Sequence, residues 1–570
     1  MLTDKGIEKK KRIYFDENFK ADEWEEVEKE FKEIEGAQIN SKDDLENLIE
    51  KYSELSYIIE ETYAWKYIKM TCNADKPQYS KAFNQFYADI VSKSQPYDFR
   101  FKKKIYESPY KDEMSSDKYA HFIRIISKDI EIFREENIPL MVKENELSNK
   151  YGEIMSGLTV DFDGEENTLL QMKKYLKYPN REVRERAWRL ISEKVFSKKE
   201  ELEKLFDDLK EIRVKIAKNA GFDNYRDYMH RAKGRFDYTP EDIFKFHDSV
   251  EKVVIPFLKE LSNERKEKLK VEKLRPWDTE VDVDGKVLKP FDDAEEFIDK
   301  SIRILYKVKP EFGQKLQMMK NSKFLDLENR KGKAPGGYNF PLAEHGAAFI
   351  FMNAVGLNSD VRTLLHESGH AMHSFAKADE KISQYKDVPS EVAELASMSM
   401  ELLTLEYLDE YYEDEEDLRK AKREQIEGTI QFLPWAMIVD AFQQWIYTNP
   451  DHTVEERTEY FKSLMDRFNQ GVDWSEFDIE KGARWLRQLH IFEVPFYYIE
   501  YAISQLGAIA IYKNYKENGP KAIEQYENFL KLGYSQSVSS IYETAGIKFD
   551  FSKDYIKEIV EFIKKELKEI

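Results

Sequence analysis

Two histidines four residues apart constrain this chain most strongly. Residues 363–373 read TLLHESGHAMH, so His366 and His370 are separated by about one helical turn and Glu367 directly follows the first of them. Residues four apart lie on the same face of an α-helix, so both imidazoles can reach one metal ion. Glu367 is rotated by about 100° from His366, which suits contact with a water beside the metal. The pattern predicts a metal-binding helix.

The flanking sequence supports a helix at this position. Residues 346–353 form a short apolar segment that predicts a β-strand, and residues 358–360 (Asn-Ser-Asp) are of the types that favour helix N-caps. Apolar side chains then recur with helical spacing at Val361, Leu364, Leu365 and Met372. The alternative interpretation is a buried helix whose two histidines have only structural roles.

A catalytic zinc ion needs a third protein ligand. His373 lies about 10.5 Å along the helix axis from His366, whereas ligand atoms about 2 Å from one ion lie within roughly 4 Å of one another. We therefore expect His373 to pack against a neighbouring helix or to support the site indirectly. The helix predicted around residues 390–401 offers two better candidates, Glu391 and Glu394.

Glu394 is the preferred third ligand because its neighbours are small or apolar. Ser390 is predicted to be the helix N-cap, so Glu391 falls in the first turn, where a carboxylate interacts favourably with the helix dipole. Glu394 lies one turn further, between Val392 and Leu395, where an ionised carboxylate is costly to bury unless it is paired or bound to a metal. Glu391 remains the alternative ligand.

Charge and cysteine content exclude several classes of function. The chain has 570 residues and a formal net charge of −20, which disfavours nucleic-acid and anionic-membrane partners. The only cysteine is Cys72, so an intramolecular disulfide and a cysteine-based metal site are excluded. The N-terminus lacks the apolar segment of a secretion signal, and polar side chains interrupt the apolar residues 494–512. We expect a cytoplasmic protein, and the oligomeric state stays open.

Helical periodicity extends over most of the chain. Residues 16–210 read as successive helices, with a break at residues 161–165, and helices resume after residue 360. The first β signal is predicted at residues 274–287, which resemble a strand and a hairpin with an Asp-Gly turn, and two further extended segments are expected near residues 324–328 and 336–338. The pattern predicts a mainly α protein with one small sheet beside the His-Glu-x-x-His helix.

These residues together resemble a known group of zinc metallopeptidases. The segment from His366 to His373, followed by Glu394 and Glu401, is similar to the metal-binding signature of the thimet oligopeptidase and oligoendopeptidase F family. The bacterial Pz-peptidase-like oligoendopeptidases are the most similar members. In that family the third ligand lies on a separate downstream helix, and the matching residue is Glu394. The clear resemblance extends over residues 276–549.

A second pair of segments resembles the substrate-binding part of the same family. Residues 333–338 (KAPGGY) with residues 349–353 are similar to its glycine-tyrosine loop and substrate-facing strand. The resemblance implies that both segments hold the substrate backbone as an added strand. The substrate-binding residues predicted in this way are Gly336, Gly337, Tyr338 and Phe351.

Residues 490–501 resemble the histidine-tyrosine segment of the family. The resemblance implies that His490, Tyr498 and Tyr501 stabilise the negative charge that develops on the scissile carbonyl oxygen, while Glu367 acts as the general base. Helical spacing alone leaves the tyrosine pair open, because Tyr497 and Tyr501 also share a helix face.

The resemblance further implies a fold and an activity. We expect two helix-rich lobes that enclose a deep channel around a zincin-like core, with residues 1–165 as the N-terminal lobe and residues 166–570 as the catalytic domain. The expected activity is zinc-dependent endopeptidase cleavage of short unstructured peptides, with one Zn²⁺ per chain. A dipeptidyl carboxypeptidase is the alternative, with Arg484 and Arg487 as candidates to bind a terminal carboxylate. An inactive peptide-binding scaffold is a further alternative.

Overall fold

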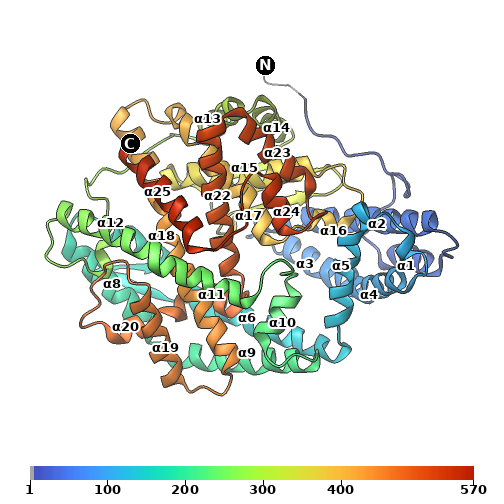
Figure 1. Cartoon of the computed structure of the whole chain (residues 1–570), viewed down its shortest axis with the longest axis horizontal. Helices are drawn as coiled ribbons and strands as arrows, with labels where there is room; N and C mark the ends of the chain where they lie inside the picture. Colours follow the sequence, from blue (N-terminus) through green and yellow to red (C-terminus); the bar gives the residue numbers. More distant parts are fainter. Residues whose placement is uncertain (1–4) are drawn as a thin grey trace.

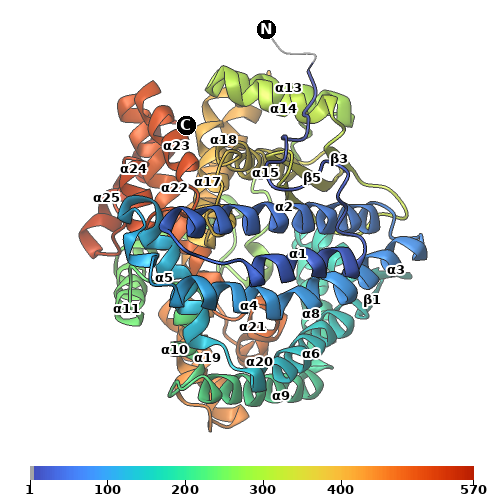
Figure 2. The same ribbon diagram turned by 90° about the vertical axis from the view of Figure 1, so that its right-hand side faces the viewer.

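Helices form most of this protein, whose computed structural model describes residues 5–570 (Figure 1). The mainly α fold class predicted from the sequence is confirmed. The N-terminal helices are α1 (Trp24–Gly36), α2 (Lys42–Cys72), α3 (Pro77–Phe86), α4 (Ser92–Glu107), α5 (Ser116–Ile132) and α6 (Ile138–Ser156). Figure 2 shows α1, α2 and α4 side by side along one face of the molecule.

Stacked aromatic rings hold the N-terminal helices together. The rings of Tyr52 on α2 and Phe101 on α4 stack with centroids 3.7 Å apart, and those of Phe31 on α1 and Tyr97 on α4 lie 5.1 Å apart. Burying such rings dominates the packing energy of a helical layer. The layer therefore packs as one unit against the rest of the chain.

A short hairpin follows where the sequence indicated only a helix break. Strands β1 (Thr159–Phe162) and β2 (Glu165–Thr168) pair antiparallel. Asp163 and Gly164 form the two-residue turn with φ of 58° and 82°, the left-handed conformation that such tight hairpins require. The first β-structure thus lies earlier than predicted, because β2 is too polar to show an apolar alternation.

The middle of the chain adds a second group of helices. These are α7 (Leu169–Leu176), α8 (Arg181–Phe196), α9 (Lys199–Asn219), α10 (Tyr225–Ala232), α11 (Pro240–Ser249), α12 (Ile255–Lys268), α13 (Ala294–Val308) and α14 (Pro310–Asn321). The strand and hairpin predicted at residues 274–287 are wrong. Only the short helix η5 (Pro276–Asp278) forms there, and the Asp282 carboxylate accepts the backbone N–H groups of Asp284 (2.9 Å) and Lys286 (3.1 Å). A partner strand is not needed to satisfy these donors.

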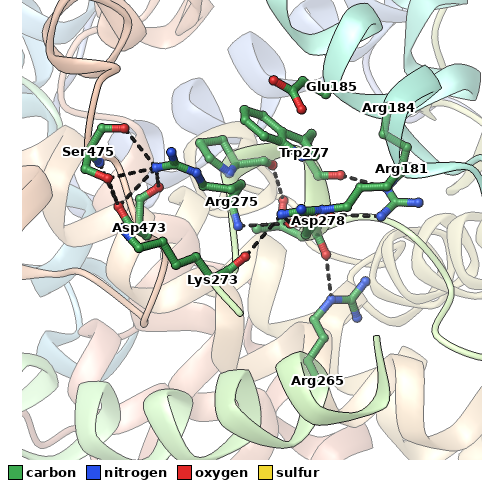
Figure 3. Close-up of polar contacts among 12 residues, drawn as sticks. Arg181, Arg184, Glu185, Arg265, Lys273, Arg275, Trp277, Asp278, Asp473 and Ser475 are labelled. Carbon is green, nitrogen blue, oxygen red and sulfur yellow. Dashed lines mark hydrogen bonds and ion pairs between the residues drawn. The ribbon is translucent and has the colours of Figure 1, made fainter. Parts of the chain in front are cut away.

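A buried carboxylate joins this segment to α8. Figure 3 shows Asp278 among basic side chains. Arg181 and Arg184 contact its two oxygens at 2.8 and 2.9 Å, and both Asp278 and Arg184 are almost fully buried. Burial alone would raise the pKa of Asp278, but hydrogen bonds from Arg181, Arg184 and the backbone N–H of Arg275 outweigh it and lower the pKa. The carboxylate is therefore ionised in the folded protein.

A three-stranded sheet lies beside the predicted metal-binding helix. Strand β5 (Ala347–Ala354) is central, parallel to β3 (Leu325–Glu328) and antiparallel to β4 (Tyr338–Leu342). This confirms the predicted strand at residues 346–353 and the extended segments near residues 324–328 and 336–338. Because β5 is paired on both edges, the outer strands β3 and β4 each have one edge that no described strand pairs with.

Helices resume after the sheet and continue to the C-terminus. Helices α15, α17 and α22 lie near the middle of the molecule (Figure 1). None of the helices in residues 5–570 has both the length and the apolar character needed to cross a bilayer. The helices of this part are α15 (Asn358–Ala376), α16 (Ser383–Lys386), α17 (Ser390–Leu403), α18 (Glu415–Thr448), α19 (Val454–Arg467), α20 (Asp478–Ala483), α21 (Leu489–Glu493), α22 (Tyr498–Asn518), α23 (Pro520–Leu532), α24 (Val538–Thr544) and α25 (Lys553–Glu569).

The Asp278 ion pair predicts a large and pH-dependent loss of stability on neutralisation. Asp278→Asn should destabilise the protein by about 3–5 kcal/mol at neutral pH, because Arg184 would stay buried without its anion. The folded pKa is below the unfolded value of about 3.9, so this stabilisation is full above that value and is lost as the pH falls through the folded pKa. Urea unfolding followed by tryptophan fluorescence measures both effects.

The matched control is Asp163→Asn. Asp163 pairs with Arg186 at 2.7 Å, but both side chains are largely exposed, so the loss should stay below about 1 kcal/mol. Equal losses for the two variants at neutral pH would contradict the role given to Asp278.

Candidate active site

Helix α15 carries the two motif histidines and begins where the sequence predicts. The Asp360 side chain accepts the backbone N–H groups of Val355, Gly356 and Leu357 at 2.8 to 2.9 Å. These bonds fix the turn that leads from β5 into α15. The helix therefore starts at a defined angle to the sheet, with its histidine face directed toward α17.

The structure brings His366, His370 and Glu394 together. The Nε2 atoms of His366 and His370 lie 3.4 and 3.8 Å from Glu394 Oε2, and one ligand atom from each residue falls within 4.8 Å of the others. Glu391 is directed elsewhere, because its carboxylate accepts the hydroxyl of Tyr238. Of the two candidates on α17, it is Glu394 that faces the imidazoles.

One glycine allows this close approach of α15 and α17. A Cβ atom on Gly369 would lie 2.6 Å from Ser397 Cα and 2.7 Å from the Ala396 carbonyl oxygen. Any side chain at position 369 would push the helices apart. The glycine inside the His-Glu-x-x-His motif therefore has a structural reason, which is the contact with α17.

A second carboxylate orients His366. Its Nδ1 donates to Glu401 Oε1 at 2.7 Å, and Gln425 Nε2 donates to Glu401 Oε2 at 2.6 Å. The bond to Glu401 leaves Nε2 of His366 free to face Glu394. The sequence contains one signal for Glu401, which lies seven residues after Glu394 and thus near the same face of α17. Gln425 lies on α18, and no local pattern indicates it.

The donor set fits a divalent zinc ion. Two imidazole nitrogens and one carboxylate are the ligands of many catalytic zinc sites, and a histidine ligand usually donates its other N–H to a carboxylate, as His366 does to Glu401. Burial alone would raise the pKa of Glu394, but His366 and His370 outweigh it and hold that pKa at about 2. An anionic carboxylate between two imidazoles is an electrostatic environment that favours a cation.

Glu367 lies beside this cluster with a carboxyl group suited to proton transfer. The residue is 8% exposed, and burial raises its pKa to about 7, with further contributions from the nearby charges of Glu394 and Glu401. A carboxyl group that titrates near neutral pH can both accept and return a proton. Asn339 on β4 donates to the Glu367 carbonyl oxygen at 3.0 Å, which ties the edge strand to α15.

His373 is a packing residue, as the spacing argument predicted. It is 2% exposed and its ring lies 6.3 Å from the ring of Phe529 on α23. Burial lowers its pKa well below the usual range, so the imidazole is neutral.

A hydrogen-bonded chain determines the protonation of His490. Trp435 Nε1 donates to Gln488 Oε1 at 2.8 Å, and Gln488 Nε2 lies 2.7 Å from His490 Nδ1. Because an indole N–H can only donate, the amide oxygen of Gln488 faces Trp435 and its NH₂ group donates to His490 Nδ1. Burial lowers the pKa of His490 to about 4, so the ring is neutral and its proton lies on Nε2.

Three tyrosines surround His490, and Tyr497 lies nearest to the metal-ligand candidates. Its hydroxyl donates to Glu394 Oε1 at 3.5 Å, and its ring lies 5.0 Å from that of Tyr501. Burial and the Glu394 charge raise the pKa of both phenols, that of Tyr497 to about 12. Tyr498 is placed on the other flank, 4.8 Å from the His490 ring. The family resemblance favoured Tyr498 and Tyr501 as charge-stabilising residues. The sequence signal for Tyr497 was its spacing of four residues from Tyr501, which places both on one helix face.

A left-handed residue positions this tyrosine. Phe496 has φ of 61°, which costs a residue other than glycine about 1–2 kcal/mol. Its N–H donates to Gln443 Oε1 at 2.9 Å, and its carbonyl oxygen accepts from Arg235. Both backbone groups of the strained residue are therefore held by buried side chains. The strained turn leads directly into Tyr497 at the start of α22.

Three of the four residues predicted to bind substrate, Gly336, Gly337 and Tyr338, lie at the start of β4 and in the loop before it. Gly336 has φ of 93°, a conformation that favours glycine, and a Cβ atom on Gly337 would lie 3.3 Å from the Phe351 carbonyl oxygen. The Tyr338 hydroxyl lies 2.6 Å from Thr71 Oγ1 on α2, which joins the edge strand to the N-terminal helices.

Two parts of the substrate prediction are wrong. Phe351 is fully buried and its ring stacks under that of Tyr338 at 4.8 Å, so it cannot contact a substrate. The strand at residues 349–353 belongs to β5, whose two edges are already paired. An added strand can pair only with an outer strand of this sheet, and β4 is the one that bonds α15 through Asn339.

The two glutamates of α17 provide a matched test of the metal site. Loss of a residue that only hydrogen-bonds a metal ligand typically lowers metal affinity by roughly 10–100-fold. Glu394→Gln removes a proposed ligand itself and should lower zinc affinity by more than that. Glu391→Gln should keep about one zinc per chain, because burial already raises the pKa of Glu391 to about 7 and it does not face the imidazoles. Elemental analysis after dialysis and chelator competition measure both. Zinc loss only in Glu391→Gln would contradict the assignment.

The fold and this site define a metallopeptidase, and the comparisons with known proteins agree. Residues 174–561 match the model of peptidase family M3, and residues 15–133 match the peptidase M3 N-terminal domain. The chain therefore belongs to peptidase family M3. This confirms the resemblance and the prediction of a metallopeptidase.

Individual relatives and solved structures show the same likeness. The chain is 25% identical to an oligoendopeptidase F homolog of Borreliella burgdorferi, over 95% of this chain and 93% of that protein. It is 26% identical to oligopeptidase PepF of Bacillus subtilis, over 54% of this chain and 46% of that protein. Among solved structures, PZ peptidase A with an inhibitor superposes with a TM-score of 0.88 and 25% identity, over 96% of this chain and 97% of that chain.

Proposed function

We propose that this protein is a zinc-dependent oligoendopeptidase that hydrolyses internal bonds of short unstructured peptides. The observation that supports this most directly is the convergence of His366, His370 and Glu394 beside the buried Glu367. We propose that these three residues hold one Zn²⁺ per chain. A bound zinc ion supplies Lewis acidity that makes water nucleophilic near neutral pH and polarises the scissile carbonyl.

Glu367 acts as the general base and then as the acid. Its carboxylate accepts a proton from water while the water oxygen forms a bond to the scissile carbonyl carbon. When the C–N bond breaks, Glu367 returns this proton to the leaving nitrogen. The pKa of about 7 suits both transfers, because neither protonation state of the carboxyl group is strongly favoured near neutral pH.

Neutral donors stabilise the negative charge that develops on the carbonyl oxygen. His490 offers Nε2–H, because Gln488 occupies Nδ1, and Tyr497, Tyr498 and Tyr501 offer hydroxyl groups around it. One such donor contributes about 3 kcal/mol to catalysis in known cases. The proximity to Glu394 favours Tyr497 and Tyr501 as the pair nearest the reacting carbonyl.

The substrate pairs with the free edge of β4 as an added strand. Asn339 on this strand bonds the Glu367 carbonyl, so backbone hydrogen bonds to β4 would hold the scissile bond close to the base. Gly336 precedes the strand and leaves open space for close backbone approach, whereas Gly337 is packed against the Phe351 carbonyl oxygen of β5.

A channel between two lobes restricts the substrate to short peptides. The Glu60 and Arg484 side chains are solvent-exposed, yet surrounding protein shifts the pKa of each, raising that of Glu60 to about 7 and lowering that of Arg484 to about 10. Side chains that are surrounded by protein and still accessible to solvent are expected along the wall of an internal space. A cavity of about 390 Å³ between α2, α4, α5 and residues 383–391 has Glu60 in its lining and reaches the first turn of α17, one turn before Glu394, which supports a space on this side of the site.

We propose that residues 1–165 form one wall of this channel and residues 166–570 the catalytic domain. The contact between Thr71 on α2 and Tyr338 on β4 supports this division, because it places the N-terminal helices beside the proposed substrate strand. The single cysteine suits a reducing compartment, and we propose a cytoplasmic location.

Cleavage of a decapeptide blocked at both ends tests the proposed activity. An endopeptidase should cut it at internal bonds, whereas a dipeptidyl carboxypeptidase requires a free carboxylate and an inactive scaffold cuts neither form. The same ten residues inside a stably folded domain should stay intact, because the folded chain cannot enter the channel. Mass spectrometry of the products decides between these outcomes, and cleavage of only the free-acid form would contradict the endopeptidase assignment.

The role of Glu367 is tested by Glu367→Gln. This variant should retain zinc and lose at least about 10²-fold in kcat, because the amide cannot accept the proton. Turnover near the wild-type rate with zinc bound would show that Glu367 is not the base.

A further inference from the structure

Arg484 and Arg487 have no hydrogen-bond or ion-pair partner among the described residues. They lie at the two ends of the short helix η7 (Arg484–Arg487), which precedes α21. Arg457, by contrast, is paired with Glu203 and Asp207.

Arg484 is held by two indole rings. Its guanidinium carbon lies 4.6 Å from the ring centroid of Trp435 and 5.5 Å from that of Trp474. Aromatic contacts of this kind engage the faces of a guanidinium and leave its in-plane N–H donors available. The group is therefore oriented in advance, while its hydrogen-bonding edge stays open.

The same indole connects Arg484 with His490. Trp435 donates to Gln488, which in turn bonds His490 Nδ1, so the arginine is separated from the proposed oxyanion donor by two side chains. The Arg484 charge also lowers the pKa of Tyr498 against the larger raising effect of burial. Arg484 is thus linked through Trp435 and Gln488 to a proposed oxyanion donor, and Arg487 lies three residues further along the same short helix.

Both arginines lie in solvent-accessible surroundings that protein partly encloses. Their side chains are solvent-exposed, yet burial lowers the pKa of each, and the charge of Arg487 contributes to the lowering at Arg484. The charge of Glu280 raises the pKa of both arginines against the larger effect of burial, but Glu280 forms no ion pair with either among the described residues. Two positive charges that repel each other in such surroundings favour binding of an anion.

We propose that Arg484 and Arg487 form a subsite for a carboxylate of the bound peptide. The proposal rests on the proposed peptidase function and specifies where an acidic group of the substrate is bound. The carboxylate comes from the peptide C-terminus or from an aspartate or glutamate side chain, and the planar guanidinium fork can bind either one through two parallel hydrogen bonds. The subsite would favour one direction of the bound peptide. It would also favour one number of residues between the scissile bond and the bound carboxylate.

Peptide binding without turnover tests this subsite. The zinc-loaded Glu367→Gln protein is titrated with three N-terminally labelled peptides of equal length, and binding is followed by fluorescence anisotropy. One peptide ends in a free carboxylate, one in an amide, and one in an amide after a terminal glutamate. The free acid should bind at least about tenfold more tightly than the plain amide, since charge-assisted hydrogen bonds to both guanidinium groups are lost in the amide.

Substitution of the arginines should abolish this preference. With Arg484→Gln and Arg487→Gln added, the ratio of Kd values should approach one, whereas Arg419→Gln, an exposed arginine on α18, should leave it unchanged. Circular dichroism and zinc content establish that each protein is folded. Arg484→Lys, which keeps the charge and removes the planar fork, should retain only part of the preference.

The outcomes separate the sources of the carboxylate. Tight binding of the glutamate-ended amide means that the subsite accepts a side-chain carboxylate, and weak binding means that it selects the chain terminus; both support the proposal. A ratio near one in the Glu367→Gln parent, no binding of the free acid, or a preference that survives the double substitution overturns it. If the preference is found but the wild-type protein cuts none of the peptides, the subsite stands and the proposed hydrolase fails.

Discussion

The contact between α15 and α17 at Gly369 is the constraint on which the candidate metal site depends. A single Cβ atom at this position would overlap the backbone of α17 at Ser397. Only with the helices this close can Glu394 reach the imidazoles of His366 and His370, which lie on either side of the glycine's turn. The three ligand candidates are thus positioned by backbone packing between two helices, which is more rigid than a loop.

A second close contact brings the oxyanion donors to the same place. A Cβ atom on Gly507 of α22 would lie 2.7 Å from Leu395 Cδ1, so α22 packs tightly against the helix that carries Glu394. The start of α22 is fixed by the strained Phe496, which directs Tyr497 toward the Glu394 carboxylate. Helix α17 therefore packs against both α15, which carries the histidines, and α22, which begins beside the tyrosines, and so fixes the position of one group relative to the other.

Local patterns predicted the parts of the site that depend on one helix. The histidine spacing and the apolar surroundings of Glu394 are properties of neighbouring residues, and they identified the residue that faces the imidazoles. Gln488 could not be identified, because its role comes from Trp435, which lies on a different helix and is distant in sequence. The hairpin predicted at residues 274–287 from its Asp-Gly turn failed for a related reason, because the Asp282 side chain accepts the backbone N–H groups of this turn and no strand pair forms. The fold class was predictable from periodicity, whereas side-chain networks between helices were not.

Anomalous X-ray diffraction at the zinc absorption edge, from crystals grown with zinc, tests the central claim most directly. The account predicts one strong anomalous peak per chain, within bonding distance of the Nε2 atoms of His366 and His370 and of a carboxylate oxygen of Glu394. The account would be contradicted by a peak at another position, or by a Glu394 side chain that points away from the peak.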